Sequence, residues 1–138
     1  MRQAAALVIS ALASLACAAP AACAAPACTL TPADGALIRQ EGVQLAWRSE
    51  PAAIAQGQLI VLNVRLCPAT AELLKLAATM PEHRHGMNYK PSIKPLGDGR
   101  FRAEGLLWHM SGRWEWRFDV RATVDAPPQT LRTSVALP

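Results

Sequence analysis

The sequence RWEWRFDVR, residues 113–121, alternates charged and large apolar side chains at every position. Successive side chains of a β-strand point to opposite faces, so this segment has one apolar face and one charged face. Such alternation is typical of a strand that covers a core on one side and meets water on the other. Two tryptophans on one face can also form a platform for stacking a ligand, but their charged partners favour the core of a sandwich. The predicted core face carries Trp114, Trp116, Phe118 and Val120.

The rest of the chain shows further short strand patterns, separated by Gly and Pro turns, and no clear amphipathic helix. Segment 71–78 has a helix-favouring composition, but Pro68 and Pro81 bracket it at strand length, so we predict a strand. The pair Ser111-Gly112 predicts a tight β-hairpin between segments 101–110 and 113–123. About seven strands in about 110 residues predict an all-β fold, an antiparallel β-sandwich of immunoglobulin-like type. The predicted strands are 43–47, 58–66, 71–78, 101–110, 113–123 and 130–137.

The N-terminus has the features of a secretory leader. Arg2 precedes an Ala-rich apolar run over residues 4–19, and small residues follow at 22–24. This pattern predicts a cleaved signal peptide over residues 1–24 and a single mature domain over residues 25–138. The run is too short and Ala-rich for a spanning helix, so we predict a periplasmic protein without a membrane span in the mature chain. Lipid anchoring is the less favoured alternative, because the residues before each candidate cysteine match a lipoprotein processing site poorly. Those cysteines are Cys17, Cys23 and Cys28.

Charge gives little indication of a partner. The formal net charge is +4, and it falls to +3 when Arg2 is removed with the leader. That charge is too small and too evenly spread to indicate nucleic-acid binding.

Two cysteines, Cys28 and Cys67, remain in the mature chain. Cysteines of exported proteins usually pair, because the compartment is oxidising. We therefore predict a Cys28–Cys67 disulfide, which closes a loop of roughly 40 residues and contributes about 4 kcal/mol in the chain-entropy model. The alternative is that one of the two sulfurs binds copper as a thiolate.

The histidines and methionines are clustered in the sequence. The chain has three His and four Met, and apart from Met1 all of them lie in residues 80–87, MPEHRHGM, or in the pair His109-Met110. In an extended segment, His83, His85 and Met87 point to the same side, while Met80 needs the turn at Pro81 to join them. The candidate metal ligands are Met80, His83, His85, Met87, His109 and Met110.

Imidazole and thioether ligands together favour copper. Thioethers prefer Cu(I), imidazoles accept either oxidation state, and zinc prefers thiolate, imidazole and carboxylate. The candidate cofactor is therefore copper, with Cu(I) preferred and Cu(II) acceptable. The alternative is an exposed polar loop with incidental histidines, in which the methionines fill gaps in the core.

The orientation of His109 depends on Gly105. Phe101 and Ala103 set an odd-numbered inner face that would bury His109. A β-bulge at Gly105 reverses this parity and buries Trp108 and Met110 instead. We predict the bulge, because it puts an indole in the core and leaves an imidazole free.

Two segments together resemble a known family. Residues 78–87, ATMPEHRHGM, and residues 107–115, LWHMSGRWE, are similar to the YtkA-like/FixH-like family of exported or membrane-tethered bacterial domains. Members show a Met-Pro-x-x-x-His-Gly-like segment followed by an aromatic-x-Met-x-Gly-x-Trp segment, and the similarity covers roughly residues 58–124. The family motif falls on Met80, His85, Gly86, Met110, Gly112 and Trp114, with His83, Met87 and His109 as additional candidates here.

The resemblance implies an immunoglobulin-like sandwich and a part in copper handling. Its expected partners are the copper ion and a periplasmic or membrane copper-dependent respiratory oxidase or its assembly factors. FixH proper is tethered by an N-terminal spanning helix, whereas the leader in this sequence is predicted to be cleaved.

Enzyme motifs are not found in the sequence. It contains no Gly-x-Ser-x-Gly, no His-Glu-x-x-His and no isolated carboxylate pair, and oxidase-type copper centres usually need more than three His. We therefore predict a non-catalytic, periplasmic copper-binding or copper-carrier protein. The alternative is an interaction module in which the Met/His segment is a docking loop and no metal binds.

Overall fold

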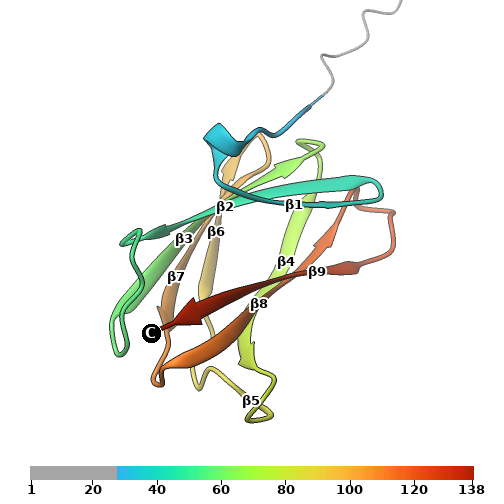
Figure 1. Cartoon of the computed structure of the whole chain (residues 1–138). Coiled ribbons are helices and arrows are strands. Elements are labelled where there is room, and N and C mark those ends of the chain that lie inside the picture. The colour runs from blue at the N-terminus through green and yellow to red at the C-terminus, as the bar shows by residue number, and fades with distance from the viewer. Residues whose placement is uncertain (1–27) are drawn as a thin grey trace, which may run out of the picture.

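The structure is a computed structural model that describes residues 28–138 (Figure 1). The predicted signal peptide, residues 1–24, and the candidate anchor cysteines Cys17 and Cys23 lie outside the described residues. Within residues 28–138 there is no helix with the length and apolarity that a membrane crossing needs.

Within residues 28–138, nine β-strands form two antiparallel sheets that pack face to face (Figure 1). The first sheet contains, in spatial order, β1 (Ala36–Gln40), β2 (Val43–Glu50), β3 (Leu59–Cys67), β7 (Arg100–Leu107) and β6 (Ser92–Gly97). The second sheet contains β5 (His85–Gly86), β4 (Glu72–Met80), β8 (Gly112–Arg121) and β9 (Gln129–Leu137). A short 3-10 helix, η1 (Pro32–Asp34), precedes β1.

The predicted antiparallel β-sandwich is confirmed, and it has nine strands rather than about seven. The predicted strand at 71–78 is also confirmed as β4. The strands absent from the prediction are β1, β5 and β6. All three are edge strands, and few of their side chains reach the core, so their sequences lack clear alternation.

The β8 face lies in the core as predicted. Trp114, Trp116, Phe118 and Val120 are each 0% exposed. All four tryptophans of the chain are in contact: Trp116 lies 6.3 Å from Trp47 and 4.7 Å from Trp108, ring centre to ring centre. Trp108 in turn stacks on Trp114 at 5.4 Å. Aromatic pairs at these separations contribute beyond the area they bury, so this cluster makes a large contribution to the stability of the core.

The predicted bulge at Gly105 is confirmed. Ile60 and Leu62 in β3 pair with Leu106 and Ala103, so β7 contains one extra residue between these two pairs. Gly105 has φ +82°, a left-handed conformation that glycine adopts without steric cost. The bulge moves the inner face of β7 from odd to even positions, and Trp108 is fully buried as a result.

The predicted hairpin at Ser111-Gly112 is wrong. β7 pairs with β3 and β6, whereas β8 pairs with β4 and β9, so the chain crosses from one sheet to the other between these strands. The physical reason is burial: Trp108 and Trp114 stack in the core between the two sheets, and this packing outweighs the local turn preference of Ser111-Gly112. We call residues 108–111, which connect the two sheets, the β7–β8 arch.

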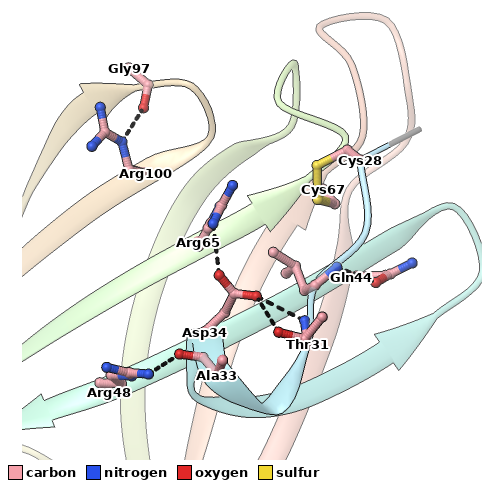
Figure 2. A network of polar contacts seen from close by, with 11 residues as sticks. Cys28, Thr31, Ala33, Asp34, Gln44, Arg48, Arg65, Cys67, Gly97 and Arg100 are labelled. Atoms are coloured by element: carbon pink, nitrogen blue, oxygen red, sulfur yellow. Dashed lines mark hydrogen bonds and ion pairs between the residues drawn. A yellow bond between two sulfur atoms is a disulfide. The ribbon is translucent and has the colours of Figure 1, made fainter. Parts of the chain in front are cut away.

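The predicted disulfide between Cys28 and Cys67 is confirmed, with a Cα–Cα distance of 5.5 Å (Figure 2). It ties the N-terminal segment to the end of β3, where Leu30 packs with Ala46 and Cys67 in a small buried cluster. Neither sulfur is therefore available as a thiolate ligand for copper.

Asp34 holds the N-terminal segment with charged and polar contacts (Figure 2). Its carboxylate accepts hydrogen bonds from the Thr31 backbone N–H at 2.8 Å and from the Thr31 hydroxyl at 3.1 Å. It also forms an ion pair with Arg65 at 2.7 Å. The hydrogen bonds from Thr31, followed by the charge of Arg65, lower the pKa of Asp34 below its usual 3.8.

We expect Asp34→Asn to lower the stability at pH 7 and to remove part of the acid sensitivity. A carboxyl group with a lowered pKa in the folded state stabilises the protein above its unfolded pKa, and this stabilisation is lost as pH falls through the folded value. The urea midpoint of the variant should therefore be below that of the wild type at pH 7, and the two should converge below pH 3.8. Asp98→Asn, at an exposed position, serves as the control. A difference in urea midpoint between wild type and Asp34→Asn that stays constant from pH 7 to below pH 3.8 would contradict the prediction.

Candidate metal-binding site

Both His/Met segments lie at one end of the sandwich, drawn at the bottom in Figure 1. β4 ends at Met80, and the chain turns through residues 81–84 into β5, which pairs back so that Met80 lies opposite His85. The Met80 carbonyl accepts from the His83 N–H at 3.1 Å, and the Ala78 carbonyl accepts from the Met87 N–H at 3.0 Å. We call residues 81–84 the β4–β5 turn. Backbone hydrogen bonds thus fix this segment as an ordered turn on the sheet.

The imidazoles of the two segments meet at His85. The ring centre of His85 lies 5.3 Å from that of His109 in the β7–β8 arch and 5.8 Å from that of His83. Two imidazoles on one ion, with metal–nitrogen bonds of about 2.0–2.1 Å, hold their ring centres roughly 5–6 Å apart. The spacing between His85 and His109 therefore fits a shared ion without a change in the backbone.

Trp114 forms the floor under this pair of imidazoles. Its buried indole lies edge-on to His85 at 6.0 Å and to His109 at 5.6 Å. The indole Nε1 donates a hydrogen bond of 3.0 Å to the Met110 carbonyl. The same side chain thus packs in the core, fixes the arch and contacts both rings.

The β7–β8 arch is also held from the segment before β3. Gln56 donates from its side-chain Nε2 to the His109 carbonyl at 3.0 Å, and the Gly57 N–H donates to the Trp108 carbonyl at 2.8 Å. On the other side, Glu82 in the β4–β5 turn forms an ion pair of 3.0 Å with Arg113 on β8. Sequence reasoning missed Gln56 and Glu82, because only the folded backbone brings them to the site.

One ring nitrogen of the site lacks a protein partner. Nδ1 of His109 is buried and has no hydrogen-bond partner among the residues that the structure describes. A buried polar atom without a partner costs free energy, and such atoms are rare in folded proteins. Nδ1 of His85 lies 3.4 Å from the Gly86 carbonyl, at the long limit of a hydrogen bond. Nδ1 of His109 therefore has no protein partner, and a neutral His85 whose Nδ1 donates to the Gly86 carbonyl has its lone pair on Nε2.

The three candidate thioethers differ in exposure. Met80 is 0% exposed and belongs to the core, and a Cβ built on Gly112 would lie 2.8 Å from its terminal methyl group. Met87 and Met110 are partly buried at the rim and pack against the core cluster. His83 is exposed on the turn, while His85 and His109 are partly buried. The structure thus leaves imidazoles and two rim thioethers nearest to solvent, and it puts the Met80 sulfur inside.

The donor set at this end of the sandwich is imidazole and thioether. Within residues 28–138 no three or more His, Cys, Asp and Glu side chains are grouped so that they could hold one metal ion. That grouping does not include methionine, whose sulfur is a ligand for soft ions such as Cu(I).

Comparison with known proteins gave no match: no family model, no curated protein and no solved structure matches this chain. The resemblance to the YtkA-like/FixH-like family therefore stays a prediction.

Proposed function

We propose that this protein is an exported copper-binding or copper-carrier protein, with His85 and His109 as the central ligands. The proposed transient ligands, which contact the ion as it enters or leaves, are His83, Met87 and Met110. Met80 packs behind the site in the core. The observation that carries the proposal is the 5.3 Å spacing between the ring centres of His85 and His109, together with the buried Nδ1 of His109, which has no hydrogen-bond partner in the part of the chain that the structure describes.

The proposed ligands are all neutral and include soft sulfur, which favours Cu(I) over Zn²⁺ and over harder ions. Imidazoles also accept Cu(II), so the site serves either oxidation state, with Cu(I) preferred. Because the ligands are neutral, none of them has to take up a proton when the ion leaves. This favours transfer of the ion by ligand exchange. The exposure of His83 supports a role as the first contact of the ion, with His85 and His109 behind it.

The proposed recipient is a copper-dependent respiratory oxidase or one of its assembly factors. The sequence resemblance supports this partner, and so does a site on the rim of the sandwich, where a second protein can reach it. The protein would act as a carrier and not as an enzyme.

Cu(I) titration against a chromophoric competing chelator, under anaerobic conditions, tests the proposal. We expect the wild type to bind one equivalent and His85→Ala/His109→Ala to bind at least about 100-fold more weakly. Loss of a ligand costs more than loss of a group that only hydrogen-bonds to a ligand, which typically weakens binding about 10- to 100-fold. His83→Ala should weaken binding less, since this ring is exposed.

The thermal midpoint of each metal-free variant verifies that it is folded. Equal affinity of the wild type and the double variant would reject the copper site. The Met/His segment would then be better explained as a docking loop that binds no metal.

A further inference from the structure

A hollow of about 440 Å³ lies on the outer face of the second sheet, beside the β4–β5 turn. Its floor is formed by β4 and β8, with β9 at one side, and its rim by the turn. Three guanidinium groups and one carboxylate line it, those of Arg84, Arg117, Arg132 and Glu115. The three guanidinium groups and the carboxylate together carry a net charge of +2.

Two of these arginines stand directly opposite each other. Arg117 on β8 pairs with Arg132 on β9, and burial of Trp116 and Phe118 puts Arg117 on the outer face. Like charges at directly opposed positions destabilise a sheet. On the neighbouring strand β4, the residue opposite Arg117 is Ala77, which is uncharged and cannot form an ion pair.

Arg117 also differs from its neighbours along β8. Arg113 forms an ion pair with Glu82, and Arg121 forms one with Glu72. Arg132 reaches Glu115 at 3.3 Å. Among residues 28–138, Arg117 has no carboxylate partner. The sheet therefore neutralises each outward arginine of β8 except the one at the hollow.

Arg84 lies over the same hollow with an unusual backbone. Its φ is +55°, in the left-handed region that residues other than glycine rarely adopt. It has no carboxylate partner among the described residues either. Strained conformations of this kind tend to persist where they serve a site.

We propose that the hollow binds a free small polycarboxylate, held by Arg117 and Arg132 and closed by Arg84. A guanidinium offers a planar pair of donors that matches a carboxylate, and two opposed guanidinium groups match a ligand with two or more carboxylates. A bound anion between Arg117 and Arg132 would turn the like-charge repulsion into attraction. The volume is of the size that small-molecule sites have, roughly 300–1,000 Å³.

The hollow adjoins the copper site but does not depend on it. His85 lines both, so a bound carboxylate would lie next to a proposed copper ligand. Anion binding is therefore measured on metal-free protein. Failure of the anion site leaves the copper proposal intact, and failure of copper binding leaves the anion site intact.

Isothermal titration of the metal-free protein with citrate at low ionic strength tests this proposal. We expect saturable binding that weakens as salt is added, because the contacts are charged and near the surface. Arg117→Gln and Arg132→Gln should each weaken binding about tenfold, since each removes a charge-assisted hydrogen-bonding pair. Glu115→Gln should tighten binding severalfold, because it removes the carboxylate that lines the hollow and frees Arg132 from its ion pair.

Arg121→Gln is the matched control, because Arg121 lies on the same strand and face but pairs with Glu72, away from the hollow and from the β4–β5 turn. It should leave citrate affinity unchanged. Equal losses in Arg121→Gln and Arg117→Gln would overturn the proposal, because binding would then follow overall charge. Absence of citrate binding would also overturn it, as would binding of an acidic Asp/Glu peptide in preference to citrate.

Discussion

Replacement of the disulfide by Cys28→Ser/Cys67→Ser is expected to lower the free energy of unfolding by about 4 kcal/mol. The two cysteines are 39 residues apart, so the bond removes a large share of the loop-closure entropy of the unfolded chain. Domains of this size are usually stable by about 5–15 kcal/mol, so the loss is a large part of the total.

The native structure should change little in this variant, because other contacts still hold the N-terminal segment. Leu30 stays buried beside Ala46, and Asp34 keeps its hydrogen bonds with Thr31 and its ion pair with Arg65. Guanidinium unfolding of the oxidised wild type, the reduced wild type and the double variant measures the effect. The reductant should not shift the variant any further. A loss below about 1 kcal/mol would show that the bond adds little beyond these contacts.

The disulfide variant also separates stability from metal binding. The N-terminal segment is at the end of the sandwich opposite the β4–β5 turn and the β7–β8 arch (Figure 1). Under conditions in which the variant is folded, its Cu(I) affinity should equal that of the wild type.

Much of the fold could be predicted because the relevant signals are local. The alternation in residues 113–121 defined a core face, and the conflict between the parity of Ala103 and the burial of Trp108 revealed the bulge at Gly105. The hairpin predicted at Ser111-Gly112 was wrong, because a turn sequence does not specify whether the next strand joins the same sheet. That choice depends on the stack of Trp108 on Trp114, which is a tertiary contact.

The candidate site could also be predicted only in part from the sequence. The clustering of His and Met in the sequence pointed to the two segments in which His85 and His109 approach each other. The opposition of Arg117 and Arg132 could not be predicted, because it depends on the register between β8 and β9. Registers of strands are set by turn geometry and by which faces are buried, and neither is visible in a charged residue alone.

Trp114→Ala is expected to lower the free energy of unfolding by about 3–5 kcal/mol. Trp114 is 0% exposed, stacks on Trp108 and supports the rings of His85 and His109. Alanine loses these contacts together and leaves a large cavity. Both the free energy of unfolding and the Cu(I) affinity should therefore fall. Guanidinium unfolding of the metal-free variant measures the stability loss, and a loss below about 1.5 kcal/mol would contradict the central place of this indole.

Phenylalanine variants separate the role of Trp114 in the core from its role at the site. Trp114→Phe and Trp116→Phe each replace a fully buried indole by the same smaller ring. Only Trp114 donates a hydrogen bond to the Met110 carbonyl, whereas Nε1 of Trp116 has no partner among residues 28–138. We therefore expect Trp114→Phe to loosen the β7–β8 arch, although the hydrogen bonds from Gln56 and Gly57 remain. Its Cu(I) affinity should fall about tenfold, as loss of a supporting contact does in other metal sites. Trp116→Phe should leave the affinity unchanged in the same competition titration, and equal effects of the two variants would show that Trp114 acts on the site only through the stability of the core.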